Sequence, residues 1–263
     1  MEVKSDTLCR RHCAGGRLRG GPPRLVIEFG RVCKRRKLKV NVDKSKVMRC
    51  SNEDPVPGLQ IQLEGEQLEK VDSFKYLGAT VAEGGDVGKE VQHRVIEASR
   101  AMGGMNKIFK NREVDMRTKR GLYESIIVPT ALYGAETWGL KVEDKKRLDV
   151  LEMKCLRSMS GVTIWDRNTN ESIRGRTGVK SKLSNRAEQK TLRWFGHMER
   201  MNEERLAKRV MNAEVEGANP RGRPKLGWGE GVKNSLKKRN INSLEEGRVI
   251  AQDRKEWKKI VKK

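Results

Sequence analysis

Apolar residues recur at helical spacing through the middle and the end of the chain. Residues three, four or seven positions apart lie along one face of an α-helix. The first such series follows Asp86 and comprises Val91, Val95, Ala98, Met102, Met105 and Phe109. A second helix is predicted over residues 117–128, where Pro129 should end it. Two later series comprise Leu148, Leu151, Cys155 and Met159, and then Leu183, Ala187, Trp194, Met198 and Met201. Residues 228–238 and 244–261 are predicted to form the last two helices.

Residues 24–82 show a mixed pattern. A short helix with a basic back is predicted over residues 24–37 from the spacing of Leu25, Phe29, Val32 and Cys33. Strands are predicted at Val40–Val42, at Val47–Met48, at Leu59–Leu63 where apolar and polar residues alternate, and at Leu68–Val71. Glu64–Glu66 should form the hairpin turn between the last two. Phe74–Val81 is predicted to be one further strand.

These patterns predict an α+β fold. A small antiparallel sheet with one helix comes first, and a mostly helical bundle with C-terminal helices follows it. We expect four segments: an irregular segment 1–23, the α/β segment 24–82, the helical segment 83–215, and a basic linker with C-terminal helices at 216–263.

Positive charge is concentrated at the two ends of the chain. The 263 residues include 58 Lys and Arg against 35 Asp and Glu, a formal net charge of +23. Residues 1–49 contribute +11 and residues 217–263 contribute +9, whereas residues 50–216 contribute only +3. Such ends favour a polyanion as partner, because each neutralised phosphate releases condensed counterions. A solvated lysine-rich surface is the alternative explanation.

The composition argues against a membrane protein and against a secreted, disulfide-bonded one. The apolar run Ile126–Val128 is broken by Pro129 and is too short to span a bilayer. Met1–Asp6 contain no apolar signal sequence, and the five cysteines have no repeating spacing. We therefore expect an intracellular protein with no membrane partner. The basic runs Lys34–Lys37 and Lys237–Arg239 permit either a nuclear or a cytoplasmic location.

Three short motifs suggest chemistry, and each has a structural alternative. Cys9–Cys13 contains two cysteines and a histidine, but a structural zinc site needs four ligands and no second pair is suitably spaced. Arg221–Pro224 has the form of a minor-groove hook or of a solvated linker. Trp194–Arg200 offers aromatic rings for base stacking, although core packing of Trp194 is the favoured interpretation. No catalytic triad or phosphate loop stands out, so no small-molecule substrate is expected.

Five blocks of residues follow one another in a specific order. The first two are Asn41-Val-Asp-Lys44-Ser45-Lys46 and Phe74-Lys75-Tyr76-Leu77-Gly78. The other three are Val128–Trp138, Leu151–Arg157 and Leu192–His197. From about Leu25 to the C-terminus the chain thereby resembles the C-terminal part of the reverse transcriptases of non-LTR (LINE-type) retrotransposons. In that family the first block closes the palm, the second forms a hairpin that grips the primer end, and a helical thumb follows.

The resemblance implies descent from an RNA-directed DNA polymerase, but not activity. In the intact family, upstream aspartates, including a Tyr/Phe-Ala-Asp-Asp turn, hold two Mg²⁺ ions that activate the primer hydroxyl. This sequence has no Asp-Asp pair, so we expect no catalytic residues, no metal site and no cofactor in this chain. Lys44 or Lys46 matches the palm-closing lysine that meets the nucleotide's phosphates. The residues that match the primer grip are Phe74, Tyr76, Leu77 and Gly78.

The N-terminal segment gives a hypothesis for the missing aspartates. Leu8–Leu18 can be encoded so that a frame shifted by one base reads Tyr-Ala-Asp-Asp-Thr-Ala-Leu-Val-Ala-Asp, the expected catalytic turn and strand. On this hypothesis residues 1–23 are the catalytic strand read out of frame, and the cluster Cys9–Cys13 has no selected role. Sequencing the genomic DNA and the transcript upstream of Arg24 tests it.

We therefore expect a truncated reverse transcriptase with a palm remnant, a primer-grip hairpin and a thumb-like bundle. It should bind RNA, DNA or RNA–DNA hybrid through phosphates. The candidate contacts are Arg35, Arg36, Lys37, Lys39, Lys75, Arg221, Arg223 and Lys225. One alternative is a non-enzymatic DNA-binding module, indicated by an A·T preference that disappears on Arg223→Ala. The other is a decayed product without function, indicated by the absence of a cooperative melt.

Overall fold

The computed structural model describes residues 21–48, 61–63, 65–82, 85–213 and 226–262, with side chains from residue 26 onward. It divides into two compact units. The first comprises Met1–Asp86 and Asn202–Pro224, and the second Val87–Met201 and Lys225–Lys263. The expected α+β class is confirmed. The predictions for Cys9–Cys13, Arg221, Arg223 and Lys225 lie outside the described residues.

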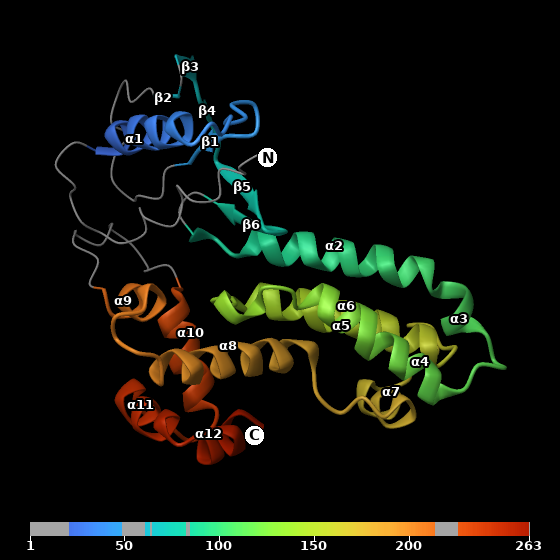
Figure 1. Cartoon of the computed structure of the whole chain (residues 1–263). Coiled ribbons are helices and arrows are strands. Elements are labelled where there is room, and N and C mark those ends of the chain that lie inside the picture. Colours follow the sequence, from blue (N-terminus) through green and yellow to red (C-terminus); the bar gives the residue numbers. More distant parts are fainter. Residues whose placement is uncertain (1–20, 49–60, 64, 83–84, 214–225, 263) are drawn as a thin grey trace. The chain divides into compact units, whose positions relative to one another are not determined.

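Within its described residues, the first unit holds two helices and short paired strands (Figure 1). The helices are α1 (Gly21–Arg35), which begins three residues before the predicted start, and α9 (Leu206–Asn212), which was not predicted. The strands are β1 (Lys46–Val47), β2 (Gln62–Leu63), β3 (Glu66–Gln67), β4 (Glu69–Lys70), β5 (Ser73–Tyr76) and β6 (Ala79–Ala82).

The expected single antiparallel sheet is wrong for the described strands, which form three separate pairs. The pairs β2–β3 and β5–β6 are antiparallel, whereas β1 and β4 run parallel, with Lys46 opposite Glu69. Each pair spans only two to four residues per strand. The apolar face of α1 and the β2 strand instead bury a small common core made of Val26, Cys33, Val40, Ile61, Leu63 and Leu68.

Phe74–Val81 is a hairpin and not the single strand that the alternation predicts. Tyr76 pairs with Ala79, and the two residues between them, Leu77 and Gly78, have φ of +47° and +85°. Two consecutive positive φ angles are typical of a type I′ turn, which matches the twist of a two-residue hairpin. The hairpin that the family resemblance implies is therefore present at this position.

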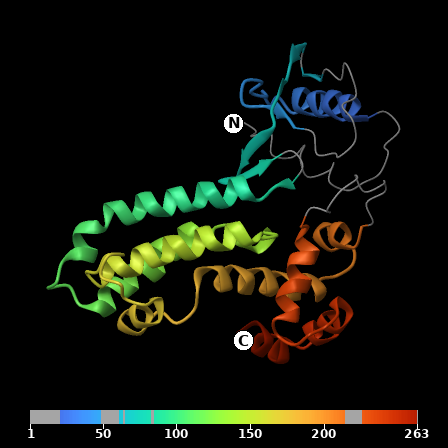
Figure 2. The same ribbon diagram turned by 180° about the vertical axis from the view of Figure 1, so that it is seen from behind.

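The second unit is helical (Figures 1 and 2). Its longer helices are α2 (Gly88–Gly104), α6 (Val142–Met159) and α8 (Leu183–Glu199). In both views α2, α6 and α8 lie side by side. The shorter helices are α3 (Asn106–Lys110), α4 (Met116–Leu122), α5 (Val128–Ala131), α7 (Asn170–Thr177), α10 (Trp228–Lys237), α11 (Leu244–Gln252) and α12 (Arg254–Lys262). Among the helices of the described ranges, none combines the length and the apolar character that a membrane span requires.

Three local predictions for this unit are wrong. Pro129 does not end its helix, because a π-helical segment, Tyr123–Ile127, precedes it and α5 continues to Ala131. The widened π turn leaves room for the proline ring. Residues 244–261 form two helices, because the side chain of Asp253 accepts the Lys255 N–H (2.7 Å) and starts a new helix.

The third concerns the aromatic residues of α8. Trp194 is only half-buried, and its ring lies 5.4 Å from that of His197. Phe195 is the core residue, since it is 2% exposed and its ring lies 5.6 Å from that of Trp257. One position along a helix turns a side chain by about 100°, so Phe195 and not Trp194 faces the core, whereas Leu183, Ala187 and Met198 are buried as predicted.

Helix α8 contributes to two hydrophobic cores. Leu183 and Ala187, in its first half, belong to the larger core formed with α2 and α6. Leu192 and Phe195, in its second half, belong to a smaller core with α10, α11 and α12. Gly196 lets Trp257 lie directly on α8, where the indole N–H donates to the Leu192 carbonyl at 3.0 Å.

Candidate nucleic-acid interface

The C-terminal end of α1 is closed by a backbone motif that places Lys37 in an unusual conformation. The Leu38 N–H donates to the Cys33 carbonyl (2.9 Å), and the Lys37 N–H donates to the Lys34 carbonyl (3.0 Å). These are the two bonds of a Schellman motif, whose C′ position is normally glycine. Lys37 occupies that position with φ of +53°. Lys37 therefore has a strained backbone conformation at a position where its side chain is exposed.

A basic groove lies between α1 and the β2–β3 hairpin. Its volume is about 830 Å³, and α1 contributes Ile27, Gly30, Arg31 and Lys34 to its wall. Lys37, Leu38 and Lys39 follow the helix, and Gln62, Leu63 and Gly65 close the other side. We call this hollow, with its basic side chains Arg31, Lys34, Lys37 and Lys39, the α1 groove. No carboxylate is among its lining residues in the described part of the chain.

The sequence predicted only part of this groove. Lys37 and Lys39 line it, whereas Arg35 and Arg36 are exposed but do not line it. Arg31 and Lys34 were missed. Their spacing from Ile27 and Gly30 is the signal that finds them, because positions i, i+3, i+4 and i+7 share one helix face.

The block Asn41–Lys46 forms a tight turn that leads into β1. The Asn41 side chain accepts the Lys44 N–H (3.0 Å), and the buried Ser45 hydroxyl donates to the Asn41 carbonyl (2.8 Å). Asn41 and Ser45 thus have structural roles here. Lys44 is exposed, and Lys46 forms an ion pair with Glu69 on the neighbouring strand. Lys46, one of the two predicted phosphate-contacting lysines, thus already has an anionic partner.

The predicted primer-grip residues lie on the β5–β6 hairpin. Phe74 and Tyr76 are half-buried, and Lys75 between them is exposed. Leu77, at the turn, is 62% exposed. An apolar side chain held outward at a left-handed position is unusual and is typical of functional sites. Lys75 is not among the residues that line the α1 groove.

In the second unit many basic side chains have carboxylate partners. Glu152 is fully buried and accepts hydrogen bonds from both terminal nitrogens of Arg174, from the Leu183 N–H (3.2 Å) and from the Tyr123 hydroxyl (3.4 Å). Burial, and then the charge of Glu152, raises the pKa of Tyr123 above its usual value. This network joins α6, α7, the start of α8 and the π-helical segment Tyr123–Ile127.

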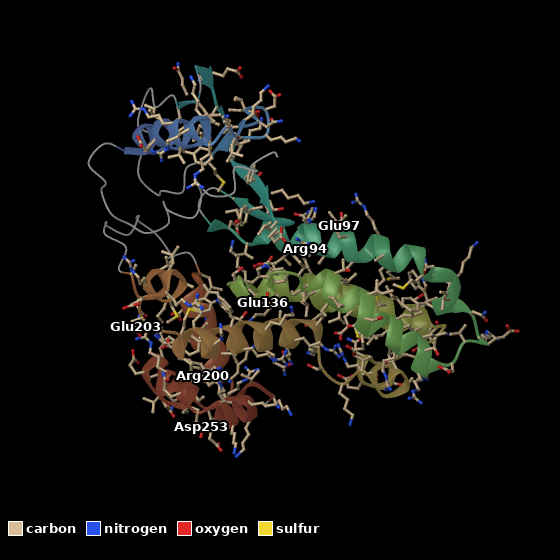
Figure 3. The ribbon with its side chains drawn as sticks, viewed as in Figure 1. Arg94, Glu97, Glu136, Arg200, Glu203 and Asp253 are labelled. Carbon is tan, nitrogen blue, oxygen red and sulfur yellow. The ribbon has the colours of Figure 1, made fainter. Side chains whose placement is uncertain are left out.

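Other basic side chains of the second unit are also paired with carboxylates. Arg186 makes a two-pronged contact with Glu124, and Lys190 donates to Glu136 at 2.9 Å. Arg94, labelled on α2 in Figure 3, donates to Glu90 at 2.6 Å and lies 4.5 Å from the centre of the Tyr133 ring. These contacts neutralise positive charge within the fold, so fewer basic side chains remain available to bind a partner.

The described residues contain no cluster of three or more His, Cys, Asp or Glu that could hold a metal ion. Cys155 is buried, and burial raises the pKa of its thiol to about 12, so it is a core residue.

The chain is similar to proteins derived from transposons. It is 24% identical over 250 residues to a putative uncharacterized transposon-derived protein of Caenorhabditis elegans, a match that covers 91% of this chain and 88% of that protein. It is 28% identical over 142 residues to a probable RNA-directed DNA polymerase from transposon BS of Drosophila melanogaster. It is 25% identical over 206 residues to the RNA-directed DNA polymerase from mobile element jockey of the same fly.

The two polymerases are much longer than this chain. The matches cover 52% and 72% of this chain but only 16% and 20% of the polymerases. Neither a family model nor a solved structure matches the chain. The homologues of this chain are thus transposon-derived proteins and the RNA-directed DNA polymerases of non-LTR elements, as its ordered motif blocks indicate.

Proposed function

We propose that this chain is a reverse-transcriptase-derived protein that binds RNA or RNA–DNA hybrid through phosphates and does not polymerise by itself. The α1 groove is its binding surface. The observation that carries the proposal is the convergence of four basic side chains on one open groove of about 830 Å³. Binding to phosphates should be tolerant of sequence and sensitive to salt.

The charge state of the groove supports this proposal. Arg31 has a contact with Glu28 at 3.4 Å, but both side chains are more than half exposed, so the pair holds the guanidinium weakly. Lys34, Lys37 and Lys39 have no carboxylate partner among the described residues. A polyanion in the groove would therefore displace water and counterions and would not have to break a strong ion pair.

The lack of polymerisation is supported by the sequence. The chain contains no adjacent aspartate pair, and the described residues contain no carboxylate cluster fit for magnesium. A lysine such as Lys44 has no phosphoryl transfer to assist in the absence of metal ligands. Extension of a primer on an RNA template in magnesium by this chain alone would contradict this part of the proposal.

The binding part is tested with two matched double variants. Lys34→Gln with Lys37→Gln removes two charges that line the groove, and Arg35→Gln with Arg36→Gln removes two charges beside it on the same helix end. Fluorescence anisotropy with a labelled RNA–DNA hybrid over a series of salt concentrations measures the affinity. We expect the salt dependence to fall by about one unit for each lost phosphate contact in the groove variant only.

Equal losses in the two variants would mean that binding follows net charge and not the groove. The same titration with duplex RNA and duplex DNA determines which nucleic acid is preferred. If DNA of A·T-rich sequence binds best, the chain is instead a DNA-binding module.

A further inference from the structure

The loop between α6 and α7 presents two large apolar side chains to solvent. Trp165 is 89% exposed and Ile164 is 77% exposed. The other tryptophans of the chain are buried or half-buried, and Trp138 and Trp257 are only 4% and 3% exposed. An exposed tryptophan forgoes the large hydrophobic stabilisation of burial, so its outward position requires a reason.

Local hydrogen bonds hold this loop in a defined shape. The Asp166 carboxylate accepts the Thr163 N–H at 2.5 Å and the Thr163 hydroxyl at 2.8 Å. These bonds lower the pKa of Asp166. The Val162 N–H donates to the Arg157 carbonyl at 3.1 Å, which ties the start of the loop to α6. Trp165 therefore lies on a turn that is held by hydrogen bonds, so the loop should lose little conformational entropy when a partner binds.

Cationic side chains surround the loop. Arg176, on α7, donates to the Asn168 side chain at 3.1 Å, and Arg157, on α6, donates to the Asn170 side chain at 2.8 Å. Arg167 directly follows the turn and is exposed. Residues 157–182 contain six basic and two acidic side chains, and one of the six, Arg174, is paired with Glu152 inside the fold. A partner at this site should combine negative charge with a flat apolar group.

We propose that Trp165 is a base-stacking platform for single-stranded RNA or DNA, with Arg167 and Arg176 contacting the adjacent phosphates. A nucleotide in a single strand offers both a flat base and a phosphate. A duplex does not fit, because its bases already stack on one another. The proposal rests on the proposed function in that the chain acts on nucleic acid, but it adds a second site of different specificity in the second unit.

The test compares the full chain with Trp165→Ala and Trp165→Phe. The probes are a labelled oligo-dT strand and a strand of equal length with abasic sugars, which keeps the phosphates and lacks the bases. We expect Trp165→Ala to weaken oligo-dT binding by about 5- to 150-fold, the range for one stacked base, and Trp165→Phe to retain most of it. Both substitutions should leave binding of the abasic strand unchanged.

Two outcomes would overturn the proposal. One is an unchanged affinity of Trp165→Ala for oligo-dT, and the other is an equal loss on both strands, which would exclude stacking. Trp165→Leu separates stacking from a general apolar contact: leucine has no ring to stack on a base, so full affinity of this variant for oligo-dT would also contradict stacking. Val249→Ala, at a side chain that is 73% exposed on α11, is the surface control and should not change binding.

The same set of variants separates this proposal from the proposed function. If the groove variant Lys34→Gln with Lys37→Gln binds hybrid normally while Trp165→Ala loses oligo-dT, the proposed groove function fails and the stacking site stands. If the groove variant loses hybrid and Trp165→Ala binds oligo-dT normally, the stacking site fails and the groove stands.

Discussion

The second unit and the α1 groove of the first unit differ in how their basic side chains are paired. In the second unit, Arg174 and Arg186 each make two-pronged contacts with a carboxylate, and Lys145 and Lys238 both donate to Glu188. In the first unit, the lysines of the α1 groove have no carboxylate partner among the described residues. The difference teaches that net charge alone does not locate a binding surface, because paired charges belong to the fold and unpaired ones remain available.

The first prediction tests whether the paired charges of the second unit are structural. Glu152→Ala leaves Arg174 without its partner in a buried site, so we expect a loss of about 3–5 kcal/mol in the free energy of unfolding. Urea denaturation followed by tryptophan fluorescence measures it, since all five tryptophans lie in the second unit. The control is Glu256→Ala, which removes an exposed partner of Lys259 and should change little. Equal losses of unfolding free energy in both variants would contradict a structural role for the buried ion pair.

The second prediction tests how tightly the second unit is packed. A Cβ at Gly196 would lie 2.1 Å from Nε1 of Trp257, so Gly196→Ala must displace the indole and its hydrogen bond to Leu192. We expect a loss of about 1–3 kcal/mol. Gly175→Ala in α7, where nothing lies within 4 Å of the new Cβ, should instead add roughly 0.5–1 kcal/mol. Thermal and urea unfolding measure the change in unfolding free energy of both variants. An unchanged stability of Gly196→Ala would contradict the described packing.

The third prediction concerns the cost of the α1 groove in the first unit. Lys37→Gly relieves a left-handed lysine, so it should stabilise α1 by about 1 kcal/mol while weakening the binding of hybrid. Lys34→Gly removes the same charge from within α1 and should destabilise the helix by up to about 1 kcal/mol. Hydrogen exchange of the α1 amides measures both effects. If the two variants lose similar affinity for hybrid while their stabilities change in opposite directions, the lost affinity is due to the lost charge and not to a change in the stability of α1.

The fourth prediction is the smallest and appears only in acid. Burial raises the pKa of Glu188, but the hydrogen bonds from Lys145 and Lys238 outweigh it and hold the pKa below the usual 4.5. Its contribution to stability is therefore complete above about pH 4.5 and is lost as the pH falls through the lowered value. Glu188→Gln should flatten this part of the curve of unfolding free energy against pH. Glu171→Gln, at an exposed glutamate of α7, should leave the curve unchanged.

The periodicity of apolar residues predicted the long helices well, because each of these helices buries one face in a hydrophobic core. Leu148, Leu151, Cys155 and Met159 are all buried on α6, as their spacing indicates. The errors came from features that act over a single turn. Examples are the π turn before Pro129 and the side chain of Asp253 that separates α11 from α12.

The candidate sites were predicted less completely than the helices. Lys37 and Lys39 follow from composition, and helical spacing places Lys34 and Arg31 on one face of α1, but only the folded chain shows that Gln62, Leu63 and Gly65 close a groove beside that face. The partner of Arg174 is 22 residues away in sequence, so no local pattern reveals that its charge is internal. Trp165 carries no sequence signal either, since only the folded chain shows that its indole is left outside.

Helix α8 has a mechanical consequence. One uninterrupted helix supplies Leu183 and Ala187 to one core and Leu192 and Phe195 to the other. Tension applied to the last helices of the chain would be carried along this rod to the larger core, because no loop within it can stretch to absorb the load. In a single-molecule pulling experiment, α8 would thus make the two cores of the second unit yield together, as one event and not as two.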